Sequence, residues 1–418
     1  MSRLVLIAAL AACNPTVDAA PAAPRIDWQP AIELAAGGGQ KGPWQQNNSK
    51  FDYVDDPSVA LGADGAAYVA WVDHRTKDIH FQIYERDGKP RLTRPTRVSR
   101  SAEIFSWLPR VAVAQESVFV LWQEIVFSGG SHGGEIFFAR STDGGATFGD
   151  AINLSNSING DGKGRIDKDT WNNGSLDLAR GPDGTLYATW TEYDGALWFT
   201  RSRDQGQRFA KPVLVAGDAK RPARAPALAI GDRVYLAWSY GEDPAGDIHL
   251  ASSTDGERFG APARIAKSPG FSDAPKLALD RSGTLHVAYA EDDRIRYTRS
   301  RDRGKTFEAP REVPKLAARA TFPSLAVEGR DVHVLFELHA KADEQARGLG
   351  LAISRDGGQT FGARVVAGST DPRGGWNGSH QGHLMQRLAV RGGTIAIGNS
   401  SLKHGSHSRV WLLRGQLR

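Results

Sequence analysis

The sequence predicts an all-β fold, a β-propeller of four-stranded antiparallel blades with seven blades and an N-terminal strand that closes the last one. Two observations support this prediction. One octapeptide recurs at blade-sized intervals, and a pattern of three strands occurs seven times along the 418 residues. The 47 Gly and 11 Trp also suit a turn-rich β fold with aromatic packing. Each blade of such a ring packs only on its neighbours, so the length does not require a second domain.

The octapeptide is a turn motif with one carboxylate, one glycine and one aromatic residue. Its copies are Ser141–Phe148, Ser202–Phe209, Ser300–Phe307, Ser354–Phe361 and the one-residue-shorter Ser253–Phe259, with an eroded copy at Glu85–Gly88. The aspartate accepts backbone N–H bonds across a tight turn, the glycine supplies a positive φ, and the aromatic ring packs between sheets. We therefore expect a structural role for the aspartates Asp143, Asp204, Asp255, Asp302 and Asp356.

The strand pattern consists of an innermost strand A, a strand B and a strand C before each octapeptide, and a strand D after it. The seven copies open near Pro57, Pro109, Leu176, Pro226, Pro275, Pro323 and Leu388. The last copy ends at Val410–Arg414, and too little chain follows for a strand D. Trp28–Leu34 matches the strand D of Phe259–Ile265, so we expect the N-terminal strand to close the ring and cover its edge.

The octapeptide resembles the Asp-box, or BNR repeat, of the sialidase superfamily, over residues 50–365. Sialidases have six blades, so a six-bladed ring is the alternative architecture. The resemblance implies an exo-glycosidase that binds a sugar carboxylate through three arginines and uses a Tyr–Glu nucleophile pair with an Asp acid/base. The Phe/Tyr-Arg-Ile-Pro motif of the first arginine is absent, because Arg165-Ile166-Asp167 lacks the proline.

The N-terminus predicts export and lipid attachment. Residues 1–12 form a signal peptide, and Leu10-Ala11-Ala12-Cys13 resembles a lipobox whose thiol is acylated. Residues 13–27 are then the lipidated cysteine and a disordered tether, and residues 28–418 are the propeller. Asn14 after the cysteine favours an outer-membrane lipoprotein on the periplasmic or cell-surface face. The lipid would be the only membrane contact, and the chain is expected to be a monomer. A net charge of +5 without a basic run argues against nucleic-acid binding.

The candidate functional residues gather in the D–A and B–C loops, which a propeller places on the face opposite the boxes. We call this the loop face, and the face of the A–B and C–D turns the Asp-box face. Candidate catalytic residues are Asp73, Glu192, Tyr240, Glu337, His380 and His404. Candidate substrate-binding residues are Arg75, Arg165, Arg319, Arg409, Trp44, Trp107, Trp171 and Trp376.

Histidine is unevenly distributed. Four of the 11 histidines are expected in strands, and seven in loop-face loops: His74, His132, His339, His380, His383, His404 and His407. The pairs His380/His383 and His404/His407 flank one blade, so we expect a divalent metal as one use of these four side chains. No other cofactor motif is present.

Three functions remain open from the sequence. The first is a sialidase-like exo-glycosidase of the cell envelope that binds and hydrolyses acidic glycans. The second is a non-catalytic surface propeller that binds a glycan or a protein. The third is a polysaccharide lyase or metal-binding enzyme that depends on the histidines. The sequence does not decide whether the protein is an enzyme.

Overall fold

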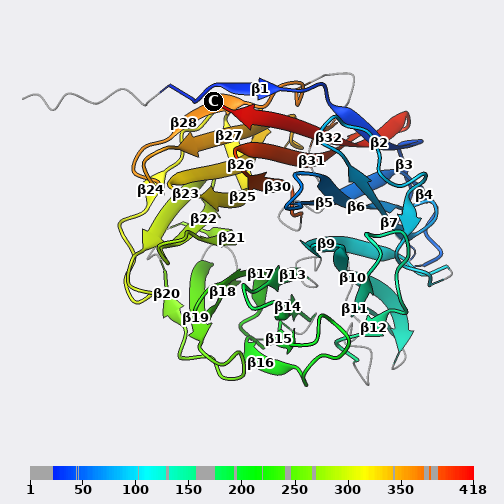
Figure 1. Ribbon diagram of the computed structural model, residues 1–418, viewed down its shortest axis with the longest axis horizontal. Helices are drawn as coiled ribbons and strands as arrows, with labels where there is room; N and C mark the ends of the chain where they lie inside the picture. The colour runs from blue at the N-terminus through cyan, green and yellow to red at the C-terminus, as the bar shows by residue number, and fades with distance from the viewer. Residues whose placement is uncertain are drawn as a thin grey trace, which may run out of the picture.

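The described residues of the computed structural model form a ring of seven antiparallel blades (Figure 1). The described ranges are 22–43, 45, 47–101, 103–128, 131–156, 175–192, 195–218, 220–240, 246–265, 270–341, 344–370, 376–377 and 385–418; only the backbone is described for 126–128, 131–133, 376 and 377. The predicted seven-bladed architecture is therefore confirmed, and the six-bladed alternative is wrong.

The strands follow the predicted A–D order in every blade. The innermost strands A are β5 (Val54–Leu61), β9 (Ser106–Ala114), β13 (Leu176–Arg180), β17 (Ala223–Ile230), β21 (Ser272–Leu279), β25 (Arg319–Glu328) and β30 (Leu388–Arg391). Strands B are β6 (Ala67–Asp73), β10 (Ser117–Ser128), β14 (Leu186–Thr191), β18 (Val234–Tyr240), β22 (Leu285–Glu291), β26 (Asp331–His339) and β31 (Thr394–Lys403). Strands C are β7 (Asp78–Tyr84), β11 (Ser131–Ser141), β15 (Leu197–Ser202), β19 (Asp247–Ser253), β23 (Arg294–Ser300), β27 (Gly348–Ser354) and β32 (His407–Leu417). Strands D of the first six blades are β8 (Thr96–Arg97), β12 (Ile152–Asn153), β16 (Val213–Ala216), β20 (Ala263–Arg264), β24 (Arg311–Glu312) and β28 (Gly362–Val365).

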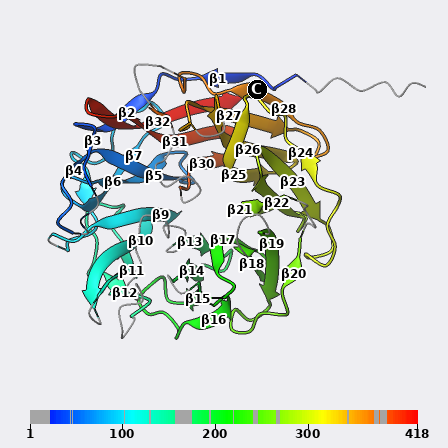
Figure 2. The same cartoon turned by 180° about the vertical axis from the view of Figure 1, so that it is seen from behind.

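The N-terminal segment supplies the outer strand of the seventh blade, as predicted. Both β1 (Ile26–Trp28) and β2 (Ile32–Gly37) pair antiparallel with β32. The predicted single strand over Trp28–Leu34 is interrupted at Pro30, which has no backbone N–H to donate to the ladder. Seen from either side, the N-terminal strands lie along the outside of β32, so the first and last parts of the chain close the ring together (Figure 2).

The Asp-boxes form the C–D turns and hold neighbouring blades together. In the sixth blade Asp356 accepts hydrogen bonds from Ser354 Oγ at 2.6 Å, Thr360 N at 3.0 Å and Thr360 Oγ1 at 2.7 Å. The ring of Phe361 packs edge-on against Tyr297 of the preceding blade. Gly358 has a φ of 89°, and a Cβ there would come within 2.1 Å of the Tyr297 hydroxyl. The positive φ and the close approach both require glycine.

Replacing Asp356 by alanine should destabilise the protein without affecting the loop face. Burial acts to raise the pKa of Asp356, but hydrogen bonds from Ser354 and Thr360 hold that pKa well below its ordinary value. Losing these bonds to a charged acceptor should lower the free energy of unfolding by about 2 kcal/mol in urea denaturation. Asp356→Asn keeps one acceptor oxygen and should lose less. The exposed Asp150 offers the matched control Asp150→Ala, and an equal loss in that variant would contradict the assignment.

The loop prediction for three histidines is corrected by the structure. The β10–β11 hairpin continues as far as the pair Ser128–Ser131, so His132 lies in β11. His339 and His407 lie at strand ends. Extra pairings stabilise the loop face: β3 (Gln40–Lys41) pairs with β4 (Phe51–Asp52), and β29 (Trp376–Asn377) pairs with β31. No helix among the described residues is long and apolar enough to cross a membrane.

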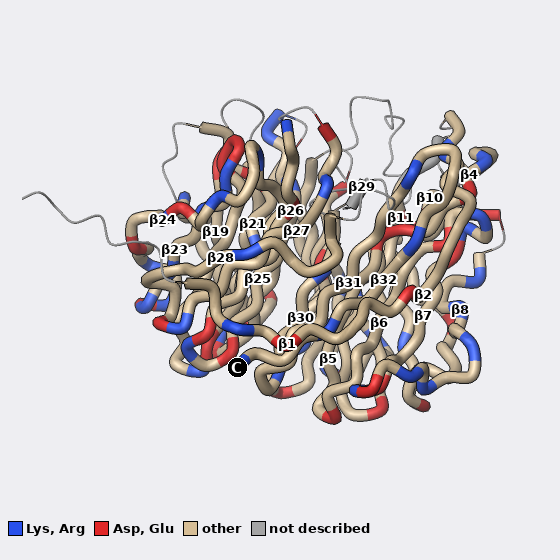
Figure 3. Tube along the Cα trace, turned by 90° about the horizontal axis from the view of Figure 1, so that it is seen from above, with Lys and Arg blue, Asp and Glu red and all other residues tan. Residues whose placement is uncertain are grey.

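The two faces of the ring carry most of the charge. In the side view of Figure 3, Lys, Arg, Asp and Glu concentrate in the turns at the two faces, whereas the strands between them are mostly uncharged. Apolar residues of adjacent blades pack against one another around the ring, as where Val59 and Trp71 of the first blade meet Leu412 of the last. The apolar core therefore lies between the blades, and polar sites are confined to the faces and the central channel.

Candidate active site in the central channel

A bulge opens the innermost strand in five blades. The residue before the strand A proline is Asp56, Leu108, Ala225, Ala274 or Phe322, with φ between 47° and 57°. Each sits at a register shift between strands A and B. Positive φ is uncommon for residues other than glycine, and bulges of this kind occur next to active sites, where they redirect side chains. The bulges place the following residues of five blades at the same level of the channel.

One residue of each strand A belongs to a pattern that recurs in all seven blades. In the five bulged blades it directly follows the proline. We call these residues the channel ring; they are Ser58, Arg110, Asp177, Ala227, Lys276, Ser324 and Arg387. A valine or leucine follows each one, and an alanine follows that, in all seven blades. Within these three residues only the ring position varies in chemistry, as expected for a ligand site on a constant scaffold. No member of this ring is among the candidate residues predicted above, although aligning the seven strands A would have revealed the pattern.

Five members of the channel ring line one cavity of about 240 Å³: Arg110, Asp177, Ala227, Lys276 and Ser324. Met385 and Gln386 complete its wall near the seventh blade. The cavity is smaller than the roughly 300–1,000 Å³ of sites that enclose drug-sized ligands. It can therefore take one group or one ring of a larger ligand, with the rest of the ligand lying on the loop face.

The charged residues of the cavity act on one another. Arg110 Nε lies 3.9 Å from Asp177 Oδ1, while Asp177 Oδ2 accepts a hydrogen bond from Leu228 N at 2.8 Å. Burial raises the pKa of Asp177, although the charges of Arg110 and Lys276 oppose the shift. Burial, and next the charge of Arg110, lower the pKa of Lys276 to about 8. The cavity thus presents two basic groups, Arg110 and Lys276, and one carboxylate, and the pKa of one of the two basic groups, Lys276, is about 8.

The seventh member of the ring forms a buried ion pair. Arg387 Nη1 donates to Glu337 Oε1 at 2.6 Å, and Nη2 donates to the carbonyl of the bulge residue Phe322 at 2.9 Å. His339 Nε2 lies 3.9 Å from Glu337 Oε2 and 2.7 Å from Thr321 Oγ1. Glu337, one of the candidate catalytic residues, is therefore held by the sixth and seventh blades together.

The other carboxylates that follow strands B have separate structural partners. Asp73 accepts the backbone N–H of Arg75 at 3.0 Å and so caps the B–C turn. Glu192 lies 3.4 Å from the indole nitrogen of Trp190, and the same spacing recurs where Trp122 Nε1 donates to Glu124 at 2.9 Å. These contacts with the protein explain why a carboxylate recurs after strand B, and the explanation does not require a ligand.

The remaining described candidates lie outside the cavity. Tyr240 accepts a hydrogen bond from Gly217 N at 3.2 Å, and the Arg221 guanidinium lies 3.9 Å from its ring centroid. Arg409 donates to Ser401 Oγ, Arg319 begins β25, and Arg75 is exposed in a turn. The described part of the chain thus brings none of the three described candidate arginines into the cavity. Arg165, Trp44 and Trp171 lie outside the described residues, as does Cys13, and the side chain of Trp376 is likewise not described.

Trp107 belongs to an aromatic cluster at the loop-face end of the first two blades. The rings of Tyr53 and His74 stack with centroids 3.9 Å apart, and Trp107 contacts Phe105 at 5.8 Å. Trp107 is 3 % exposed, so its ring packs on protein in this structure. Burial, with the charges of Asp55 and Asp56, raises the pKa of Tyr53 well above its ordinary value, which keeps its hydroxyl protonated.

The histidine cluster is only partly described. His404 is exposed in the turn between β31 and β32, and His407 is half-buried beside Ser406. Within the described ranges, no group of three His, Cys, Asp or Glu side chains is arranged to hold a metal ion. His380 and His383 lie outside those ranges, so the four-histidine metal site stays a prediction.

Comparison with known proteins identifies related folds but no sequence family. No family model matches the chain, and no curated protein matches it. A PL25 ulvan lyase bound to -[GlcA(1-4)Rha3S]- is similar with a TM-score of 0.59 and 14 % identity, over 91 % of this chain and 95 % of that one. The polysaccharide lyase Uly1 has a TM-score of 0.54 at 12 % identity, covering 94 % and 100 %. An α-L-arabinanase of Penicillium chrysogenum complexed with arabinobiose has 0.50 at 12 %, covering 79 % and 100 %. The TM-scores show a shared fold at low sequence identity. The three similar proteins are themselves carbohydrate-active.

Proposed function

We propose that the protein binds an acidic glycan on the loop face and places its anionic group in the channel cavity. The observation that carries the proposal is the pair of cations, Arg110 and Lys276, on the wall of one small cavity. The attraction between a carboxylate or sulfate and such cations is strongest when both are shielded from water, because the local dielectric constant is low.

A glycan suits the remainder of the site. Asp177, Ser324 and Gln386 offer acceptors and donors for sugar hydroxyl groups beside the two cations. The cavity holds only part of a ligand, so an extended chain would run outward to the loop face. The similar propellers include one solved with a glucuronate-containing fragment and one with arabinobiose, which supports a saccharide in the same role.

Lys276→Met should weaken the binding of an acidic oligosaccharide at least tenfold, because it removes the ammonium and keeps the chain length. Calorimetric titration with a glucuronate oligosaccharide, a sialylated oligosaccharide and a neutral glucose oligomer of equal length measures this. The neutral oligomer should bind much more weakly than at least one acidic probe. The matched control is Lys305→Met, an exposed lysine on the Asp-box face. Equal affinity for acidic and neutral probes, or no effect of Lys276→Met, would refute the proposal.

The affinity should also depend on pH. The ammonium of Lys276 attracts the anion, and its pKa in the ligand-free protein is about 8. Affinity should therefore be full below pH 8 and fall as the pH rises, with the fall shifted upward because a bound anion favours the protonated amine. Lys276→Arg keeps a charge at all these pH values and should give a flat profile between pH 7 and 9.

A catalytic role of the same site is the second candidate, favoured by the lowered pKa of Lys276. In β-elimination of a uronate, Arg110 would neutralise the carboxylate and the unprotonated Lys276 would take the proton from C5. The C4–O bond breaks, a C4=C5 double bond forms, and the leaving oxygen takes a proton from water. An ultraviolet increase would identify this lyase reaction, and new reducing ends without it would identify sialidase-like hydrolysis. Binding without either product would leave a glycan-binding propeller.

A further inference from the structure

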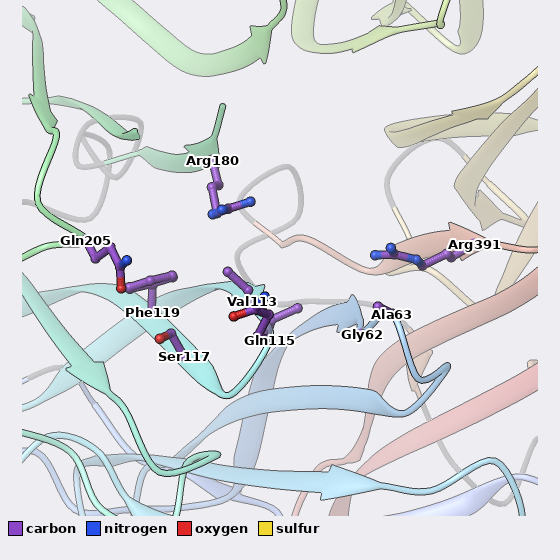
Figure 4. Close-up of a pocket in the computed structure, with 10 residues that line it drawn as sticks. Gly62, Ala63, Val113, Gln115, Ser117, Phe119, Arg180, Gln205 and Arg391 are labelled. Atoms are coloured by element: carbon purple, nitrogen blue, oxygen red, sulfur yellow. The ribbon is translucent and has the colours of Figure 1, made fainter. Parts of the chain in front are cut away.

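A second cavity lies at the opposite mouth of the channel, on the Asp-box face. Its volume is about 360 Å³, within the usual range for small-molecule sites. Figure 4 shows Arg180 and Arg391 extending their guanidinium groups from opposite sides into the same space, with Gln115 below them in this view and Gln205 beside Phe119, on the side of Arg180 away from Arg391. Arg180 ends β13 in the third blade, and Arg391 ends β30 in the seventh.

Both arginines depart from the sevenfold repeat. At the position of Arg180, three residues beyond the channel ring, the other six blades have Leu61, Val113, Ile230, Leu279, Val327 and Val390. At the position of Arg391, one residue further, the other blades have Gly62, Ala114, Gly181, Gly231, Asp280 and Glu328. The scaffold therefore requires an arginine at neither position. Two arginines that depart from the repeat at the same mouth of the channel indicate a role other than building the blades.

The carboxylates closest in sequence to these arginines have other hydrogen-bond partners, although the charge of Arg180 adds to the hydrogen bonds from Thr185 in lowering the pKa of Asp183. Glu328 accepts the backbone N–H groups of Gly392 at 2.6 Å and Gly393 at 2.8 Å. Asp183 accepts both the backbone N–H and the hydroxyl of Thr185. Neither guanidinium forms an ion pair or a hydrogen bond with another residue in the described part of the chain. Two cations thus face one cavity without a protein anion bound between them.

The two glutamines stand where the backbone favours glycine. Gln115, in the A–B turn of the second blade, has a φ of 52°, and the turns of three other blades use Gly65, Gly184 and Gly283 at positive φ. Gln205 has a φ of 56° in its box, where two other boxes have Gly144 and Gly357 and the fifth-blade box has Arg303 at 64°. A left-handed glutamine costs conformational energy that glycine avoids. At both positions the left-handed backbone carries an amide side chain that lines the cavity together with the two arginines.

We propose that this second cavity binds a tetrahedral oxyanion, a sulfate or phosphate group, between Arg180 and Arg391. Two planar guanidinium forks on opposite sides need about four acceptor oxygens, which a tetrahedral dianion supplies and a single carboxylate does not. The amide of Gln115 would donate to one of the remaining lone pairs. The site lies on the face opposite the proposed glycan site, so it does not depend on that function.

The test titrates the protein with inorganic sulfate, inorganic phosphate and acetate at constant ionic strength in a calorimeter. Saturable binding of one sulfate or phosphate per chain is expected, with acetate at least tenfold weaker. Arg180→Met and Arg391→Met should each weaken that binding tenfold or more. Because both side chains are exposed, the melting temperatures of the ligand-free variants should match that of the wild type. Tighter binding of sulfate than of phosphate would indicate a sulfated ligand, and the reverse would indicate a phosphorylated one.

The matched control is Arg281→Met, an exposed arginine in the A–B turn of the fifth blade that does not line the cavity. It removes the same charge from the same face and should leave sulfate binding unchanged. An equal loss in all three variants would mean a general attraction to the positive surface and would overturn the proposal. If Lys276→Met abolished the binding while Arg391→Met did not, the anion would lie in the channel cavity, and the proposal would also be wrong.

Discussion

Arg387→Met should lower the free energy of unfolding by about 3–5 kcal/mol, the usual effect of removing one partner from a buried ion pair. Arg387 and Glu337 are each 1 % exposed, and their nitrogen and oxygen atoms lie 2.6 Å apart. Without the guanidinium, the Glu337 carboxylate stays buried without its main counter-charge, and the Phe322 carbonyl loses a donor. Urea denaturation followed by circular dichroism measures the loss, and Arg94→Met on the surface is the matched control.

The double variant Arg387→Met/Glu337→Gln separates a structural role of Glu337 from a catalytic one. Removing both charges should recover part of the stability lost in Arg387→Met, because no uncompensated charge remains buried. If Glu337 acts on substrate, Glu337→Gln should abolish product formation by more than its change in stability explains. A loss below about 1 kcal/mol in Arg387→Met would contradict the buried pair as the joint between the sixth and seventh blades.

A chain that begins at residue 38 should fail to fold as a monomer. It lacks β1 and β2, the outer strands of the seventh blade, and leaves the 11-residue β32 as an open edge. The buried Ile26 and the partly buried Ile32 and Leu34 would also leave the apolar packing around β32, where a fully buried side chain contributes about 1.5–3 kcal/mol and a partly buried one less. Together with the unpaired edge of β32, this loss is a large fraction of the typical stability of a whole domain. Thermal unfolding with size-exclusion chromatography measures the result.

The matched control begins at residue 22 and keeps both strands. It should melt cooperatively, with the same midpoint as the full chain, and elute as one species. The shorter chain should instead aggregate, because an exposed strand edge pairs with other chains. A soluble monomer with an unchanged melting temperature would show that closure by the N-terminal strands does not stabilise the ring.

Parts of the scaffold around the candidate site could be anticipated because their determinants are local. The octapeptide specifies its own turn, since Asp356 bonds to groups within four residues of it. The period-two pattern of strand B likewise places Glu192 at a strand end without knowledge of its neighbours. Local rules could not assign roles, however, because partners such as Glu337 and Arg387 are 50 residues apart.

The sequence by itself determined the seven blades, their strand order and the closure by the N-terminal segment, because turns and alternating strands depend on nearby residues. Only the tertiary structure decided which polar residues share a site. Arg110, Asp177 and Lys276 come from three blades and meet because the ring brings every strand A to one axis. The pKa of Lys276 is likewise a property of that assembly, since burial and the charge of Arg110 lower it. Chemistry in this protein therefore arises where blades converge, whereas the fold is specified within each blade.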